Sequence, residues 1–192
     1  MKKRLALLGS GKGSNFEAIA DAAATGTLDA EVILVVSDQP NALILEKAAR
    51  RGIDARFHDP GNYRTRLAED REIALAELLV GNAVDWVVLA GWMRVVKAPL
   101  LDRFPGRIVN IHPSLLPKYS GLAAWQQALE AGETVTGCTV HFVDAGIDSG
   151  RILAQSEVSI FAGDTPESLH ARIQEAERIL YPAVLQMLCA KN

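Results

Sequence analysis

Residues 5–15 read Leu-Ala-Leu-Leu-Gly-Ser-Gly-Lys-Gly-Ser-Asn, a short apolar run that passes through three glycines into polar residues. Such a run is typical of a strand that is covered on both faces, as in parallel sheets. The amphipathic stretch that follows, residues 15–24, predicts a helix. A strand, a glycine loop and a helix in this order predict the start of a βαβ unit.

The same alternation continues through the first two-thirds of the chain. It predicts strands at 32–36, 55–57, 85–90 and 107–111, and helices at 41–50 and 63–79. Beyond residue 120 the pattern changes. It predicts a helix at 122–131, two alternating segments at 136–143 and 152–160 that form a hairpin or a mixed edge, and a closing helix at 166–188 with Thr165 as its N-cap. We therefore expect an α/β fold.

Length, composition and charge exclude several classes of protein. The 192 residues are 49% hydrophobic and predict one domain, residues 1–192. Twenty Lys and Arg against 23 Asp and Glu leave no basic excess for nucleic acid. No apolar stretch reaches membrane-spanning length, and the first is too short for a signal peptide. With two distant cysteines, Cys138 and Cys189, we expect reduced thiols and a cytoplasmic protein.

The glycine loop predicts an anion site. Backbone N–H groups and the positive end of a helix dipole converge there, and phosphate is the simplest ligand. The spacing of Gly9 and Gly11 does not fit a P-loop, and a dinucleotide fingerprint would need glycine where Ser14 stands. Asp38 nevertheless occupies a place where a ribose-binding acid could stand. The alternative is a tight turn with Ser14 or Asn15 as N-cap.

A second candidate site lies at the end of the strand predicted at 107–111. Asn110 and His112 are two residues apart, so both side chains project from one face, and Pro113 ends the ladder behind them. An asparagine amide can donate a hydrogen bond to an oxyanion, and a histidine can move protons near neutral pH. Together they indicate acyl-transfer chemistry.

A proton-carrying histidine needs an orienting carboxylate, and the best candidate is Asp148, with Asp144 in the same loop as its competitor. The other histidines have no comparable context. His58 is interpreted as a loop residue, His141 as a strand residue and His170 as part of the last helix, and no metal-ligand spacing links them.

Four segments resemble, in order, those of the phosphoribosylglycinamide formyltransferases, a family of folate-dependent formyltransferases. They are Gly11-Lys-Gly-Ser-Asn, Leu89-Ala-Gly-Trp-Met-Arg, Asn110-Ile-His-Pro-Ser-Leu-Leu-Pro-Lys-Tyr, and Val140-His-Phe-Val-Asp followed by Asp148. The resemblance implies a three-layer sandwich around a mostly parallel, mixed sheet of about seven strands with a Rossmann-like N-terminal half. It also implies N10-formyltetrahydrofolate as co-substrate, glycinamide ribonucleotide as acceptor in de novo purine biosynthesis, and no metal. The implied partners are small molecules, without nucleic acid or membrane, and the implied state is a monomer or homodimer.

The resemblance also implies roles for individual residues. The catalytic trio is Asn110, His112 and Asp148; the ribonucleotide is bound by Gly13, Ser14, Asn15 and Glu177; and folate is bound by Arg66, Met93, Arg94, Val95, Val96 and Asp144. Two departures bear on the acceptor's identity. Ala123 and Trp125 stand where the family commonly has histidines, and Arg151 replaces a proline.

We expect direct transfer, in which Asn110 and protonated His112 stabilise the oxyanion and Asp148 favours the imidazolium form of His112. Three alternatives remain. A formyltetrahydrofolate deformylase would use water as acceptor and carry an extra N-terminal regulatory domain. A methionyl-tRNA formyltransferase would add a basic C-terminal domain, and we expect neither domain in 192 residues. A nucleotide-binding reductase or sensor would use only the glycine loop and Asp38.

Overall fold

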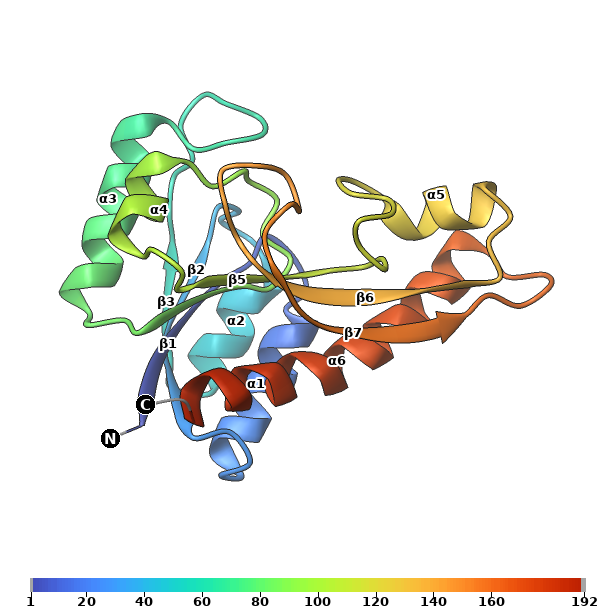
Figure 1. The fold of residues 1–192 in the computed structure, drawn as a ribbon. Coiled ribbons are helices and arrows are strands. Elements are labelled where there is room, and N and C mark those ends of the chain that lie inside the picture. The colour runs from blue at the N-terminus through green and yellow to red at the C-terminus, as the bar shows by residue number, and fades with distance from the viewer. Residues whose placement is uncertain (1, 191–192) are drawn as a thin grey trace.

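The structure, a computed structural model, describes residues 2–190 and contains one seven-stranded sheet (Figure 1). The strand order is β3-β2-β1-β4-β5-β6-β7. The strands are β1 (Lys3–Leu8), β2 (Ala30–Ser37), β3 (Asp54–Phe57), β4 (Trp86–Leu89), β5 (Ile108–His112), β6 (Val135–Phe142) and β7 (Ile152–Ser159). β1 to β5 run parallel, whereas β6 and β7 pair antiparallel to their neighbours. The predicted mixed, mostly parallel sheet is confirmed.

Helices cover both faces of the sheet and complete the three layers (Figure 1). One face packs against α1 (Ser14–Ala24), α2 (Leu43–Arg50) and α6 (Pro166–Ala190), and the other against α3 (Glu69–Gly81) and α4 (Ala98–Arg103). The short α5 (Ala124–Glu130) lies beside the start of α6. Each face buries its own apolar cluster, with Phe16 and Ile44 in the first and Leu75 and Phe104 in the second. Burial of the two clusters holds the layers together.

The strand order has a switch point at the carboxyl ends of β1 and β4. The chain winds outward from β1 in one direction through β2 and β3, and in the other through β4 and β5, and ligands bind at such switch points. The glycine loop starts here. A Cβ on Gly9 would lie 2.7 Å from Ile44 Cδ1 and 2.8 Å from the carbonyl oxygen of Ala90, so the close approach requires glycine.

The prediction departs from the structure by more than two residues in two places. The helix predicted at 63–79 begins only at Glu69, so the first six residues of that prediction are wrong. They belong to a loop in which Arg66 forms an isolated parallel bridge with Val95, and the Val95 N–H donates to the Thr65 carbonyl at 2.8 Å. These bonds use backbone groups that a helix would need for itself. The pattern also missed α4, a single short helix with Pro99 in its first turn.

The longest helix is anchored to the sheet by one hydroxyl group. Tyr181 of α6 is fully buried, and its hydroxyl oxygen lies 3.0 Å from the carbonyl oxygens of both Leu89 on β4 and Val109 on β5. Thr165 caps the start of the same helix, as predicted, by accepting a bond from the Ser168 N–H at 3.2 Å. No helix among residues 2–190 is long and apolar enough to cross a membrane.

Candidate active site

Two strands of opposite direction bring the first part of the site together. In the antiparallel register of β5 and β6, Asn110 lies opposite His141 and His112 lies opposite Thr139. The Asn110 Nδ2 atom is 3.2 Å from the Nε2 atom of His141, whose residue is only 2% exposed. The interpretation of His141 as a strand residue is confirmed, whereas the prediction that it has no context comparable to that of His112 was wrong. Finding it required the pairing register of two strands, which the sequence does not state.

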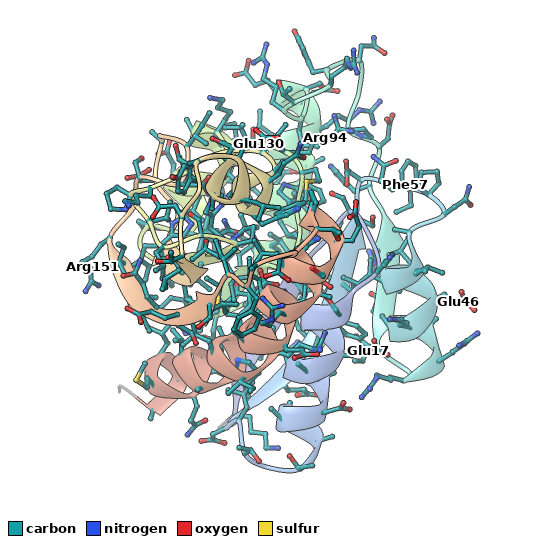
Figure 2. All side chains as sticks on the ribbon, turned by 90° about the vertical axis from the view of Figure 1, so that its right-hand side faces the viewer. Glu17, Glu46, Phe57, Arg94, Glu130 and Arg151 are labelled. Carbon is teal, nitrogen blue, oxygen red and sulfur yellow. The ribbon has the colours of Figure 1, made fainter. Side chains whose placement is uncertain are left out.

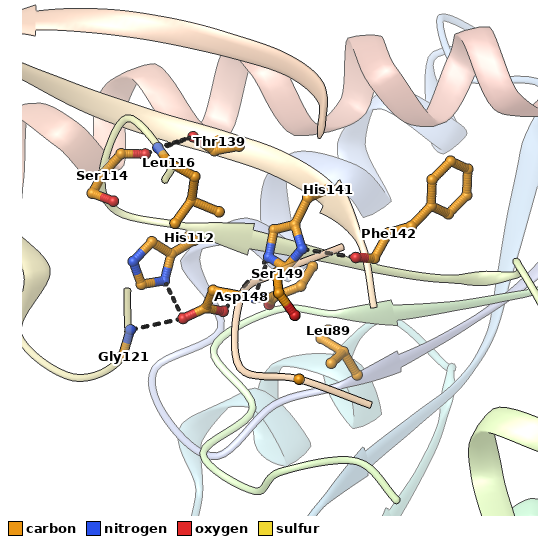
Figure 3. Close-up of polar contacts among 12 residues, drawn as sticks. Leu89, His112, Ser114, Leu116, Gly121, Thr139, His141, Phe142, Asp148 and Ser149 are labelled. Atoms are coloured by element: carbon orange, nitrogen blue, oxygen red, sulfur yellow. Dashed lines mark hydrogen bonds and ion pairs between the residues drawn. The ribbon is translucent and has the colours of Figure 1, made fainter. Parts of the chain in front are cut away.

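Asp148 completes a cluster with both histidines (Figure 3). Its Oδ2 atom lies 3.2 Å from His112 Nδ1 and accepts the Gly121 N–H at 2.8 Å, and its Oδ1 atom lies 3.6 Å from His141 Nε2. The loop that carries it bends sharply, because Asp148 has a φ of 51° and a Cβ on Gly150 would overlap the carbonyl oxygen of Phe142. The carboxylate beside His112 is thus that of Asp148.

The competing acid of that loop has a local task. Asp144 Oδ1 accepts the Gly146 N–H at 3.0 Å and the Ser149 hydroxyl at 2.8 Å, which stabilises the turn itself. Nearby Arg151 stacks over the Phe142 ring at 4.7 Å and projects outward from the molecule (Figure 2). The loop therefore presents Asp148 to the cluster while its other polar groups hold its shape.

Burial and neighbouring donors set the charges in this cluster. Burial alone would raise the pKa of Asp148, but the neighbouring His141 imidazole, the Gly121 N–H and the His112 imidazole together lower that pKa below its ordinary value. Burial lowers the pKa of His112 and outweighs the Tyr119 carbonyl and the Asp148 carboxylate, which raise it. Asp148 thus acts on His112 in the expected direction, yet the resting cluster favours a charged Asp148 beside a neutral His112.

His112 can still accept a second proton without losing a partner. Its Nε2 atom lies 2.8 Å from the Tyr119 carbonyl oxygen, and its Nδ1 atom faces Asp148. Both ring nitrogens therefore face acceptors, and both would donate in the imidazolium form. This arrangement suits a residue that takes up a proton and releases it again.

The glycine loop leads into α1 without a side-chain cap. Gly13 is the N-cap residue in a left-handed conformation, with φ 73°, and no side chain bonds to the helix start. The alternative prediction of Ser14 or Asn15 as N-cap is therefore wrong. The first helical bond runs from the Glu17 N–H to the Gly13 carbonyl at 3.1 Å, which leaves the N–H groups of the preceding turn without helical partners. These donors can meet an anion.

A buried pair joins α1 to α6 beside that loop. Asn15 Nδ2 donates to Glu177 Oε2 at 2.9 Å, and the two residues are 7% and 6% exposed. Burial raises the pKa of Glu177 to about 7, although the Asn15 hydrogen bond and the Arg178 charge lower it. The Oδ1 atom of Asn15 is buried and has no hydrogen-bond partner within residues 2–190. The pair therefore holds an unused acceptor next to the helix start.

The segment expected to contact folate follows the end of β4, at the switch point of the sheet. Met93 is 59% exposed, and its N–H donates to the Ser10 hydroxyl at 3.0 Å, whereas Val96 is buried. The Arg66 guanidinium lies 4.0 Å above the Tyr63 ring. Exposed Met93 and half-buried Arg66 are thus available to a ligand at the carboxyl ends of β1 and β4.

The Arg94 side chain is occupied by the protein. Its Nε atom donates to Asp38 Oδ2 at 2.6 Å, and its Nη1 atom donates to the carbonyls of Tyr63 and Arg64 at 2.6 and 2.7 Å. The Asp38 side chain is fully buried in this pair. Asp38 is therefore not free to bind a ribose. The nucleotide-binding alternative needs Asp38 for that contact, so the structure disfavours it.

Comparisons with known proteins agree on one family. Residues 3–185 match the family described as formyl transferase. The trifunctional purine biosynthetic protein adenosine-3 of Drosophila melanogaster is 46% identical over 189 residues, and that of Homo sapiens is 41% identical over 189 residues. These matches cover 97% and 98% of this chain but 14% and 18% of the relatives, so the chain spans less than a fifth of their length.

Solved structures show the same fold. Glycinamide ribonucleotide transformylase 1 from Symbiobacterium toebii is 47% identical, with a TM-score of 0.93, and the match covers 98% of this chain and 88% of that one. Phosphoribosylglycinamide formyltransferase from Bacillus halodurans is 45% identical, with a TM-score of 0.92, and the match covers 98% and 96% of the two chains. This chain therefore belongs to the formyl transferase family.

Proposed function

We propose that residues 1–192 act as one formyltransferase domain that transfers a formyl group from N10-formyltetrahydrofolate to the amine of glycinamide ribonucleotide. This is a step of de novo purine biosynthesis, and we place it in the cytoplasm with small-molecule partners only. The cluster of Asn110, His112 and Asp148 is the observation that carries the proposal. It combines an amide donor, an imidazole that titrates and a charged carboxylate. The names of the related proteins support the same substrates.

The mechanism follows from the resting charges of the cluster. As the acceptor amine attacks the formyl carbon, the formyl oxygen gains negative charge, and the Asn110 amide donates a hydrogen bond to it. Neutral His112 takes the proton that the amine loses. The resulting imidazolium lies between Asp148 and the Tyr119 carbonyl and supplies that proton to the folate nitrogen as its bond to the formyl carbon breaks. No covalent enzyme intermediate is needed.

His141 is a positioning residue in this mechanism. Its Nδ1 atom lies 2.8 Å from the Phe142 carbonyl oxygen, which can only accept, so the ring proton sits on Nδ1. Its Nε2 atom then accepts one N–H of Asn110 at 3.2 Å. The Asn110 amide is thereby held with nitrogen toward the cluster, and its second N–H remains for the formyl oxygen.

Two sets of predicted residues take the substrates. Gly13, Ser14, Asn15 and Glu177 bind the ribonucleotide, because the uncapped start of α1 suits its phosphate. Arg66, Met93, Arg94, Val95, Val96 and Asp144 form the folate side at the ends of β4 and β6. Since the Arg94 guanidinium is bound to Asp38, Arg94 contributes through its backbone and through the loop that it holds.

The test is to follow release of tetrahydrofolate from N10-formyltetrahydrofolate with three acceptors. Glycinamide ribonucleotide should support fast release, and other amino sugar phosphates or no acceptor should not. Fast release with another amino sugar would assign a different acceptor, to which the residues at positions 123 and 125 would be adapted. Release without any acceptor would assign a deformylase and contradict the proposal. Asp148→Asn serves as the inactive control.

A further inference from the structure

One face of α6 runs past the glycine loop with three polar residues. His170, Gln174 and Glu177 have the spacing i, i+4 and i+7, which places them on the same side of the helix. Glu177 bonds to Asn15 in the first turn of α1, so this side faces the loop. At about 1.5 Å per residue, His170 lies roughly 10 Å along the axis from Glu177. Gln174 and His170 thus extend the same surface away from the buried pair.

His170 is held in place by an aromatic stack. Its ring centroid lies 3.7 Å from that of Trp125 on α5, and the two ring planes differ by 3°. Its Nε2 atom is 3.3 Å from the amide nitrogen of Gln174, which can only donate, so the His170 proton sits on Nδ1. Within residues 2–190 this Nδ1–H has no hydrogen-bond partner in the protein. A fixed imidazole thus presents an unused donor.

The groups around the His170 imidazole supply positive charge and hydrogen-bond donors, and no carboxylate among the described residues pairs with them. Burial lowers the pKa of His170, and the charge of the Lys12 ammonium in the glycine loop lowers it further. Among the described residues, no carboxylate pairs with Lys12 or His170. The indole face of Trp125 favours a cation above it. A phosphate group would receive charge-assisted bonds here and would also favour protonation of His170.

We propose that His170 is a phosphate ligand, and that the phosphate of a sugar phosphate binds between the N–H groups at the start of α1 and the side chains of Lys12, His170 and Gln174. The sugar then lies toward the Asn15–Glu177 pair, where the buried, unpartnered Asn15 Oδ1 accepts a hydroxyl group. Trp125 positions His170. This inference rests on the proposed function and assigns a task to the residue that stands in place of a histidine.

The test uses ribose 5-phosphate as the probe and isothermal titration calorimetry as the measurement. His170→Ala should weaken its binding about 10-fold or more, because a charge-assisted hydrogen bond is lost. Ribose without phosphate should bind both proteins equally. His170→Asn keeps an N–H near the position of Nδ1 and should retain most of the affinity, and Trp125→Phe should do the same, unlike Trp125→Ala. His58→Ala is the matched control, since His58 bonds to the Arg71 carbonyl elsewhere in the molecule.

A second measurement needs no variant. Nitrogen-15 NMR of the wild-type ring should show His170 moving toward the imidazolium form when ribose 5-phosphate is added. Equal binding by His170→Ala and His58→Ala, or no binding by the wild type, would overturn the inference. The proposed function is decided separately, because tetrahydrofolate release by the wild type with glycinamide ribonucleotide is measured independently of these two results. In that assay His170→Ala should raise the KM for the ribonucleotide and leave the KM for folate unchanged.

Discussion

Two carboxyl groups that are largely removed from water have pKa values shifted in opposite directions. Asp148, in the loop between β6 and β7, faces the Gly121 N–H and two histidines, and its pKa is lowered. Glu177, on α6, faces a single side-chain donor, Asn15, and burial raises its pKa to about 7. Both groups are removed from water, so burial disfavours both charges. The difference follows the surroundings of each carboxyl, which are an N–H group and two imidazoles around Asp148 and a single amide beside Glu177.

The comparison also separates two tasks. A carboxylate that must stay charged to serve His112 needs polar neighbours, and a sharply bent loop brings Asp148 to them. A carboxyl that meets a sugar can remain close to its neutral form and offer both a donor and an acceptor. The following predictions test this contrast, from the largest expected effect to the smallest.

Asp148→Asn should have the largest effect. Without the carboxylate, turnover should fall about 10²–10⁴-fold, the range expected for a general acid or base that has lost its partner. Asp148 raises the pKa of His112, so its removal should lower that pKa and move the acid limb of kcat/KM to lower pH. Steady-state kinetics across pH measure both. Asp102→Asn, on the exposed surface of α4, is the control, and equal activity of the two variants would contradict the role of Asp148.

Arg94→Ala tests a third buried carboxylate. Asp38 is fully buried, and the Arg94 guanidinium is its only cationic partner in an ion pair among the described residues. Removing Arg94 leaves that charge unpaired and should lower the free energy of unfolding by about 3–5 kcal/mol. The double variant Asp38→Asn/Arg94→Ala should recover part of the loss. Urea unfolding measures this, and an Arg94→Ala loss no larger than that of exposed Arg103→Ala would show that the pair is not needed.

Glu177→Gln should change the pH dependence of stability. Since the pKa of Glu177 in the folded chain is about 7 against an ordinary 4.5, its ionisation destabilises the fold as the pH rises through 7. The shift corresponds to about 3 kcal/mol. The variant should therefore match the wild type near pH 4.5 and be more stable by up to about 3 kcal/mol at pH 8, as measured by urea unfolding. Exposed Glu175→Gln should show no such pH-dependent difference, and a constant difference for Glu177→Gln would refute the assignment.

His141→Phe should have the smallest effect. It removes one neutral hydrogen bond to Asn110, worth about 1 kcal/mol, so kcat should fall roughly five-fold. His141→Gln restores an acceptor and should recover part of the loss, and neither variant should alter the KM for the ribonucleotide. In an Asn110→Ala background the His141 effect should disappear. Additive effects would show that His141 does not act through Asn110.

The parallel half of the fold and half of the cluster could be predicted from the sequence. Continuous apolar runs identify β1, β2 and β4, because strands covered on both faces need such runs. Two-residue spacing places Asn110 and His112 on one face of β5. The structure also brings Asp148 to His112, as expected from the need for an orienting carboxylate.

The remainder depends on contacts between distant residues. His141 joins the cluster through an antiparallel register that no local pattern encodes. The helix predicted from residue 63 is shortened because the Arg94 guanidinium, about 30 residues later, donates hydrogen bonds to the carbonyls of residues 63 and 64. Only the family resemblance singled out Glu177, because its partner Asn15 is 162 residues away and its spacing is also that of an exposed helix face.

The Tyr181 hydroxyl has a consequence for inhibitor design. Tyr181 lies one turn beyond Glu177 on α6 and bonds to the carbonyl of Val109, the residue before Asn110 on β5. The residues that we propose for the sugar and for the formyl group are thereby joined through one buried side chain. A compound that links a sugar phosphate to a folate-like ring must match this fixed separation, because a linker that cannot span both subsites loses the gain from simultaneous binding. The separation of the two subsites in the fold therefore determines the length of the linker.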